Sequence, residues 1–530
     1  MANLTYDDII KSDDLNKIKE TFSNQKVAFN QTVSIIGTEA VTKRDKTGEQ
    51  YQVETIAQYK VEQHNVFDPQ MRKMKIVNAP TTETDKNGEP VYKLTLVDVA
   101  RVGIPFQELI VNRRVGFMLS DPVTTDILFS KDTEEEKALL EMVDRIQNDN
   151  KCDYKNKELA RRMMSEMECA EIWYFVPNTD PDIKGQYTLR MKVLSPDLGD
   201  RLWPLFDEVG DLIAFAREYK LRNIDGVDIN HYDIYTKDLE YKWIQRDTKW
   251  ILDDQLNPNI NPIPNPVGKI MIIYYTQPQP EWAKVQSMIE RFEMVISNHA
   301  DTNDYFGNPI LTVSGKVQGF AAKGEQGKIL ELENGAQANY LALSSEPASV
   351  KMEQENLERF IYTMSQTPNI TFSEMKGMGA ISGIALKLLF LDAHMAVKSK
   401  EEIFGTGLQR RLNLLKAAIG KIVDTSLKAA SLQVQLKPVI TPYLPMNETE
   451  VISNLSIALT SGIISQESAV EQNPYVADSE SEMERITGEA DKQAQQESKL
   501  ASLMQKNSID NANQTQNNNG QNSNLNTQQN

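Results

Sequence analysis

Two carboxylates one helical turn apart are the residues of this sequence best suited to chemistry. Asp301 and Asp304 lie three residues apart in the run Asp-Thr-Asn-Asp, so a helix would place them on neighbouring turns, where they could share a divalent metal ion. With a distant histidine, such a pair could support a metal-dependent nuclease or phosphodiesterase. No third carboxylate lies close by in sequence, and carboxylates at a helix end are usually solvated. The sequence therefore predicts no metal and no other cofactor.

Two glycine-rich segments resemble nucleotide-binding loops but depart from them at decisive positions. In the run 324–329, Gly-Glu-Gln-Gly-Lys-Ile, the first glycine is too close to the second for a phosphate loop. Ile329 also replaces the Ser or Thr that would hold magnesium. The run 377–382, Gly-Met-Gly-Ala-Ile-Ser, follows a helix broken by proline instead of a strand, and it ends in Ser instead of Gly or Ala. We interpret the first run as a glycine loop and the second as a backbone hinge.

The spacing of the cysteines and histidines is not typical of a catalytic or metal-binding site either. The two cysteines, Cys152 and Cys169, are not in a Cys-x-x-Cys pair, and Cys169 lies beside Ala170, Ile172 and Trp173, which favours a buried structural thiol over a nucleophile. The four histidines are scattered along the chain, which argues against a His-rich metal site; they are His64, His231, His299 and His394. The last two lie in apolar helical patterns, where packing or an interface is expected.

Composition narrows the class of protein. The chain has 530 residues, of which 40% are hydrophobic and 25% charged, and its formal charge is −18. Proteins that wrap nucleic acid usually carry the opposite sign, so tight binding over a broad surface is not expected. No run of about 18 apolar residues occurs, and the first residues lack the pattern of a signal peptide. We expect a cytosolic, reduced and soluble protein with no membrane partner.

The first half of the chain predicts helices followed by an antiparallel sheet. Helical spacing marks the first 30 residues and residues 133–170, while Lys-x-Gly turns at 46–48 and 86–88 indicate hairpins or surface loops. From Ile172 to Tyr275, short segments rich in aromatic and β-branched residues follow one another without helices between them, which favours an antiparallel meander. These segments are Ile172–Val176, Tyr187–Leu194, Leu212–Leu221, Asp233–Tyr235, Tyr241–Arg246 and Lys269–Tyr275.

The second half predicts a two-helix stalk. A helix over 282–305 carries an apolar stripe, which suits packing beside neighbouring copies in a ring. A second helix starts near Pro347, Pro368 interrupts it, and a third runs from Ser382 to about Phe404. The glycine-rich residues between the first two helices would project from the stalk. The last 26 residues hold 16 Asn or Gln, which predicts a disordered tail.

The order of these parts resembles the siphophage-type portal proteins of tailed double-stranded DNA bacteriophages. The likeness covers roughly residues 95 to 430. It is carried by the runs 112–124, 194–197, 205–219, 265–275, 285–306, 308–315 and 381–387, the first reading Asn-Arg-Arg-Val-Gly-Phe-Met-Leu-Ser-Asp-Pro-Val-Thr and the last Ile-Ser-Gly-Ile-Ala-Leu-Lys.

The resemblance implies an α+β fold with a mixed α/β wing, a two-helix stem, a small α/β clip, a long kinked helix after a tunnel loop, and a helical crown. The implied bounds are 1–281 for the N-terminal part of the wing, 282–305 for stem helix 1, 306–346 for the clip, 347–366 for stem helix 2, 367–381 for the tunnel loop, 382–405 for the long helix, 406–445 for the C-terminal part of the wing, 446–490 for the crown and 491–530 for the disordered tail.

The resemblance also implies a function without catalysis. Twelve copies would form a ring at one vertex of the virion capsid, assembled in the host cytoplasm, through which double-stranded DNA is packaged and ejected. Expected partners are terminase, a head-completion adaptor protein, and the major capsid and scaffold proteins; ATP hydrolysis would belong to the terminase. The alternative is a metal-dependent nuclease or phosphodiesterase using Asp301 and Asp304. Another structural head protein is a weaker possibility, because the order of stem, loop and long helix has no reason to occur there.

Two sets of side chains are predicted to act in this function. In the tunnel loop, Lys376 is the only basic residue, and it is expected to contact DNA together with Ser373, Gly377 and Gly379. In the clip, polar and basic residues are expected to contact the partner proteins: Lys316, Gln318, Lys323, Gln326 and Lys328.

Overall fold

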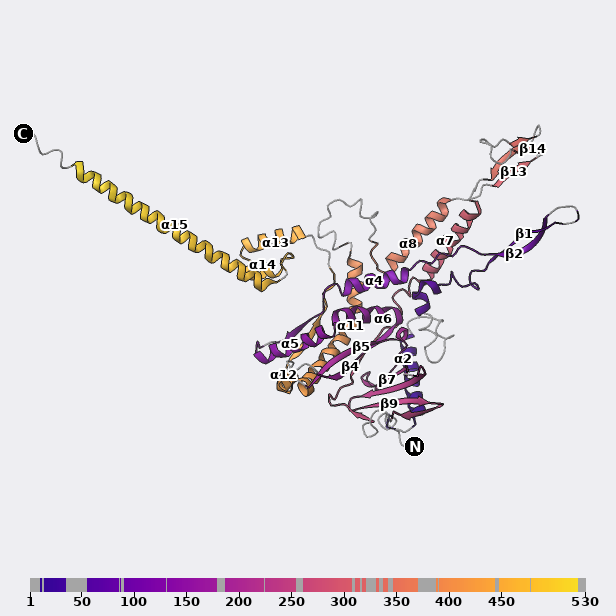
Figure 1. Ribbon diagram of the computed structural model, residues 1–530, viewed down its shortest axis with the longest axis horizontal. Helices are drawn as coiled ribbons and strands as arrows, with labels where there is room; N and C mark the ends of the chain where they lie inside the picture. Colours follow the sequence, from indigo (N-terminus) through magenta and orange to yellow (C-terminus); the bar gives the residue numbers. More distant parts are fainter. Residues whose placement is uncertain are drawn as a thin grey trace, which may run out of the picture. The chain divides into compact units, whose positions relative to one another are not determined.

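Two compact units make up the chain in the computed structural model (Figure 1). Unit 1 comprises Met1–Gly377 and Leu389–Tyr443, and unit 2 comprises Met378–Leu388 and Leu444–Asn530. The structure describes residues 10–11, 14–34, 55–84, 86, 90–129, 131–178, 186–223, 225–253, 261–306, 310–314, 317–320, 330–332, 337–341, 347–369, 388, 390–443, 448–476 and 478–522. It has the mixed helix and strand content expected of an α+β portal fold.

An antiparallel meander forms the larger sheet of unit 1, and the prediction is confirmed for the segments Leu212–Leu221, Asp233–Tyr235 and Tyr241–Arg246. The prediction of one meander from Ile172 to Tyr275 is wrong, because the other three segments form a separate sheet. Its strands are hydrogen-bonded in chain order: β6 (Arg201–Phe206), β7 (Leu212–Arg222), β8 (Asp228–Thr236), β9 (Leu239–Arg246) and β10 (Lys249–Leu252), with β11 (Ile263–Pro264) added on β9. Helix α2 (Leu15–Ser34) covers one face, where Ile18 and Phe22 pack with Trp203, Tyr232 and Trp243. Burial of these large side chains on one face fixes the register of the sheet.

A second antiparallel sheet links the meander to the helices of unit 1. It has the order β12 (Ile272–Thr276), β4 (Glu168–Pro177) and β5 (Tyr187–Leu194). Phe215 of β7 packs with Tyr274 of β12, so the two sheets share an apolar core. The helices of this region are α4 (Phe106–Met118), α5 (Glu134–Asp149) and α6 (Cys152–Glu166); Thr133 caps α5 by accepting the N–H of Glu136.

Two helices and four short strands form the predicted stalk region. Helix α7 (Gln286–Phe306) and helix α8 (Pro347–Met364) lie side by side, and Arg291 is ion-paired with Glu353 at 2.8 Å. Between them in sequence, β13 (Ile310–Ser314) pairs with β16 (Gln337–Leu341), and β14 (Val317–Phe320) pairs with β15 (Leu330–Leu332). Because β13 and β16 are antiparallel, the chain leaves along α7 and returns along α8 (Figure 1).

A long two-stranded hairpin precedes these elements. Strand β1 (Lys75–Thr84) pairs with β2 (Pro90–Val97) as an antiparallel hairpin; residues 87–88 of the predicted Lys-x-Gly turn lie outside the described residues. The turn at 46–48 lies outside the described residues. The remaining elements of unit 1 are the short 3₁₀ helices η2 (Val61–Gln63), η3 (Pro196–Leu198) and η5 (Thr425–Leu427), the π turn η4 (Ile419–Val423), α12 (Lys428–Gln433), and a strand pair formed by β3 (Thr124–Leu128) and β17 (Gln435–Val439).

Helix α11 (Leu391–Ala418) corrects the predicted bounds of the third helix. The prediction of an end at 404–405 is wrong: the helix continues to Ala418 and buries Leu408, Leu412 and Leu415. A glycine in a helix interior costs about 1 kcal/mol relative to alanine, but Gly407 is needed for close packing. A Cβ on it would lie 2.0 Å from the ring of Tyr275. Most of the predicted start, residues 382–387 and 389, lies outside the described residues.

Unit 2 contains three described helices, α13 (Glu448–Thr460), α14 (Gln466–Glu471) and α15 (Ser479–Asn522). The prediction of a disordered tail from 491 is wrong for the described part, because α15 continues to Asn522. Asp478 caps its first turn by accepting the N–H of Ser481 at 3.2 Å, and Ala, Leu, Glu, Gln, Lys and Met have high helix propensity. The side chains of residues 491–504 are nevertheless exposed. Low hydrophobicity therefore leaves this helix uncovered without preventing it from forming.

Candidate functional site

Asp301 anchors the root of the hairpin on helix α7. Its Oδ2 accepts a hydrogen bond from Arg72 at 2.7 Å and lies 3.2 Å from Nζ of Lys75, while Oδ1 accepts the N–H of Ala100 at 2.8 Å. Burial tends to raise the pKa of Asp301, but the N–H of Ala100 and the neighbouring cations hold it below the ordinary carboxyl value. Because Arg72 and Lys75 already neutralise this carboxylate, it is poorly suited to bind a metal cation. Within the part of the chain that the structure describes, no group of three His, Cys, Asp or Glu side chains could hold a metal ion.

Further polar contacts attach residues 64–104, hereafter the collar, along the same side of α7. His64 Nδ1 lies 2.6 Å from Oε1 of Glu293, and both side chains are buried. The collar also donates to Glu290 from Asn65 at 3.0 Å and to Ser297 from the N–H of Val102 at 2.9 Å. Asp301 continues this row, since positions three or four residues apart share one side of a helix.

The apolar side of α7 is covered within the same chain. Val285 and Ile289 are buried, and Phe292 packs edge-on against Phe106 of α4, whose ring centroid lies 5.4 Å away. Phe106 in turn contacts Tyr362 of α8 at 5.9 Å. The interpretation of this stripe as a surface for neighbouring copies is therefore wrong. Periodicity shows which side of a helix is buried, but not whether the covering residues come from the same chain.

Side chains of α4 hold the first residues after α8. Arg114 donates to the carbonyl of Ser365 at 2.7 Å, and Arg113 donates to the carbonyl of Pro368. Glu281 lies 3.0 Å from Nε of Arg114 and 2.7 Å from Nζ of Lys400 on α11. Burial lowers the pKa of Arg114, and the adjacent Glu281 partly offsets this effect. The end of α8 and the body of α11 are thus tied to one buried charge cluster.

A second buried ion pair joins α11 to β4. Arg411 donates from Nε to Glu171 at 2.8 Å and from Nη2 to the other carboxylate oxygen, and its Nη1 donates to Asn156 at 2.7 Å. Burial alone would lower the pKa of Arg411, but the carboxylate beside it raises it overall. Cys169 lies nearby on β4 and is buried, as predicted; burial raises its pKa well above the ordinary thiol value, which makes it a poor nucleophile.

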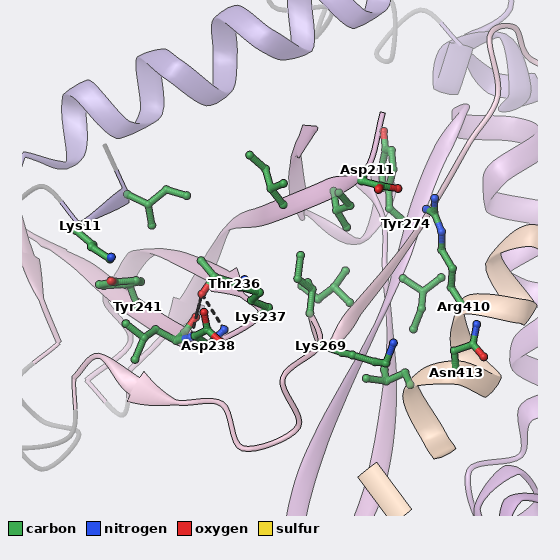
Figure 2. A pocket seen from close by; sticks show the side chains of 18 residues that line it. Lys11, Asp211, Thr236, Lys237, Asp238, Tyr241, Lys269, Tyr274, Arg410 and Asn413 are labelled. Atoms are coloured by element: carbon green, nitrogen blue, oxygen red, sulfur yellow. Dashed lines mark hydrogen bonds between the residues drawn. The ribbon is translucent and has the colours of Figure 1, made fainter. Parts of the chain in front are cut away.

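An open groove of about 680 Å³ lies between the meander, strand β12 and helix α11 (Figure 2). Its apolar lining residues include Leu212, Ile270 and Leu414. Its rim carries Lys11, Asp211, Lys237, Asp238, Lys269 and Arg410 (Figure 2). The hydrogen bonds drawn in the groove belong to the β8–β9 turn, where Thr236 Oγ1 accepts the N–H groups of Asp238 and Leu239. These contacts shape a turn and do not assemble a nucleophile with a base.

Comparison with known proteins identifies the family. Residues 98–496 match the family model described as phage portal protein, SPP1 Gp6-like. The chain belongs to this family. It is 21% identical over 419 residues to the portal protein of Bacillus phage SPP1, covering 76% of this chain and 78% of that protein. A solved structure titled "Neck of empty GTA particle computed with C6 symmetry" matches with 11% identity and a TM-score of 0.38, covering 68% of this chain and 87% of that chain.

The portal family match includes α7, α8 and α11 but begins after the hairpin. Of the predicted tunnel-loop residues, Ser373, Lys376, Gly377 and Gly379 lie outside the described residues. The same holds for Lys316, Lys323, Gln326 and Lys328 of the predicted clip, while Gln318 lies in β14. Next to these segments the structure describes α7 and α8, which precede and follow residues 310–341 in sequence, and the hydrogen bonds that Arg114 and Arg113 donate to Ser365 and Pro368.

Sequence reasoning missed the charge cluster around Glu281 in the portal chain. From the sequence pattern, no role in such a cluster is predicted for Arg113, Arg114 or Glu281. A signal was present: Arg114 lies between Val111, Val115 and Met118 on one side of a helix, and an arginine on an apolar side needs a buried partner. The sequence gives no indication of which carboxylate that partner is. No helix among the described residues is long and apolar enough to span a membrane.

Proposed function

We propose that this portal protein forms a ring of twelve copies at one capsid vertex, with a central channel through which double-stranded DNA is packaged and ejected. The observation that carries the proposal is the stalk. In this member of the portal family, the chain runs out along α7 and returns along α8. The strand pair β13–β16 lies between the two helices in sequence. Copies arranged around an axis would place these stalks side by side as the wall of a tube.

The charge of the chain supports a channel that does not retain DNA. Twelve copies at −18 each carry −216 in total. A wall of this sign repels phosphates, so DNA passes without being trapped by counterion release.

The tunnel loop, residues 367–381, is the part proposed to touch DNA. Helix α8 ends at Met364, Gln366 has a left-handed backbone with φ of 52°, and Pro368 two residues later cannot continue a helix. The hydrogen bonds from Arg113 and Arg114 hold the departing chain, so the loop starts from a fixed base. Twelve copies of Lys376 would form one thin basic ring, whose exposed contacts to phosphate are weak and screened by salt.

The clip, residues 306–346, is proposed to dock the terminase during packaging and a head-completion adaptor afterwards, through Lys316, Gln318, Lys323, Gln326 and Lys328. Deletion of residues 318–335 tests this, because it removes the outer strand pair and keeps β13 and β16. We expect rings to form and adaptor binding in a pull-down to be lost. Adaptor binding that survives the deletion would contradict the assignment.

Imaging the purified protein tests the ring itself. Negative-stain class averages should show rings with a central hole and twelve repeating densities. Compact particles without a hole would contradict the proposal.

A further inference from the structure

The β1–β2 hairpin exposes its larger and more exposed apolar side chains on one face. Directly paired residues of an antiparallel hairpin share a face, and the pairs Ile76–Leu96 and Asn78–Leu94, with Tyr92 next along the strand, define the arm face. Ile76 is 68%, Leu94 71% and Leu96 63% exposed, and Tyr92 is 59% exposed. The other face alternates with it and carries Lys75, Lys93 and Thr95 beside the smaller and less exposed Val77 and Val97, at 38% and 43%. In the described part of the chain, no element covers the arm face.

An isolated hairpin of this composition requires a partner. Two strands alone are marginally stable in water, and a contiguous apolar surface marks an interaction site. At about 3.4 Å per residue and two strand widths of about 4.8 Å, one face of a ten-residue hairpin measures roughly 34 by 10 Å. That is about 340 Å², far below the ~800 Å² per partner of a stable complex between separate proteins. The arm face is therefore suited to add to a larger contact and not to hold a partner alone.

A second group of exposed apolar side chains lies on helix α8. Met352, Phe360 and Met364 are 61%, 41% and 51% exposed, and with Asn356 they form one row at intervals of four residues, the α8 ridge. At the edge of this ridge, the guanidinium of Arg359 lies 5.4 Å from the ring centroid of Phe360. The collar occupies the side of α7 that carries Glu293 and Ser297. The contacts towards α8 and α4 are made from Arg291 and Phe292, which lie roughly 140° one way and 120° the other way round the helix from that side. The collar with its hairpin and helix α8 thus flank α7 on different sides.

We propose that the arm face of one copy packs on the α8 ridge of the next copy in the ring. A closed ring of identical chains needs two different complementary surfaces on the two flanks of each copy, and these two apolar surfaces meet that requirement. The small area of the arm face is consistent with a neighbouring copy as the partner. Within a ring, the other contacts between copies hold the two surfaces at high effective concentration, so a small contact can form although it would be too weak between separate proteins. This inference rests on the proposed ring.

Cross-linking between differently tagged copies tests the contact. Leu94→Cys in one copy and Phe360→Cys in another, co-expressed, bring together two single thiols, because the native Cys152 and Cys169 are buried. A short bis-maleimide should yield covalent pairs that carry both tags. Thr95→Cys, one residue along the same strand and on the other face, is the matched control and should yield at least tenfold fewer pairs with Phe360→Cys. Equal yields from both strand positions would overturn the assignment of the arm face.

Charge insertion supplies an independent measurement. Leu94→Asp with Leu96→Asp places two carboxylates on the arm face, and Thr95→Asp with Val97→Asp places the same two charges on the other face of the same strand. We expect the first variant to lose most of its rings in light scattering and the second to keep them. Rings that survive the first variant, with no mixed cross-links, would overturn the arm contact while leaving the proposed function intact. A wild-type protein that forms no ring would overturn the proposed function itself.

Discussion

Replacing Asp301 by asparagine tests how the collar is held on α7. The asparagine oxygen can still accept the N–H of Ala100, but it carries no charge for Arg72, whose side chain is only 6% exposed. A hydrogen bond between charged groups at such a site contributes about 1.5–3 kcal/mol. The pair with Lys75, which is 56% exposed, adds less than about 1 kcal/mol. We expect the substitution to destabilise the collar by about 2–3 kcal/mol.

Hydrogen exchange measures this effect directly, because the collar can open without global unfolding. A loss of about 2–3 kcal/mol should speed exchange of the amides of residues 72–101 by roughly 30- to 150-fold. Asp304→Asn is the matched control, since Asp304 is exposed and lies one turn further along the same helix. Unchanged exchange in Asp301→Asn, or an equal effect of Asp304→Asn, would refute the reasoning.

The same carboxylate sets the pH dependence of the collar. The pKa of Asp301 is lower in the folded protein than its ordinary value, so ionised Asp301 stabilises the fold above the unfolded-state pKa, and this contribution is lost as the pH falls through the folded-state pKa. Protection of the collar amides, corrected for intrinsic exchange, should therefore be constant from about pH 8 to about pH 5 and fall only below the ordinary carboxyl range. A loss of protection near neutral pH would contradict this assignment.

Three further predictions concern the core, the tunnel loop and the C-terminal helix. Arg411→Met should lower the free energy of unfolding by about 3–5 kcal/mol in urea titrations, because it leaves a buried carboxylate unpaired; a loss below about 1 kcal/mol would contradict this. Lys376→Glu, or Gly377→Ala with Gly379→Ala, should leave rings assembled but slow or stall DNA packaging in vitro, and wild-type rates in both variants would refute a role on DNA. Truncation at Ser498 should leave the Tm of the ring unchanged, because the described side chains removed are exposed; a large drop would show that α15 packs on a partner copy.

The elements with regular local patterns could be predicted from the sequence. The meander from β7 to β9 follows from short β-branched and aromatic segments separated by turn residues, and α7 and α8 follow from helical spacing of apolar residues. Strands β6 and β10 were missed: β6 contains Pro204, which breaks the pattern of a strand, and β10 has only four residues.

Contacts between distant parts of the chain could not be predicted. Arg72 and Asp301 are 229 residues apart in sequence, and no local pattern specifies that pair among the many arginines and carboxylates. The role of Gly407 could not be predicted either. In the sequence it is only a residue of low helix propensity, and the reason for a glycine there is the ring of Tyr275, which packs against it. The candidate site was thus predicted as a set of segments, while the side chains that hold those segments together came from the structure.

The native mass of the purified full-length chain tests the central claim most directly. A ring of twelve copies of 60.1 kDa has a mass near 721 kDa in multi-angle light scattering. We expect that mass, unchanged on dilution, together with ring-shaped particles in the same fraction. A monodisperse monomer or dimer, at 60.1 kDa or twice that value, would contradict the account of this chain as a ring-forming portal.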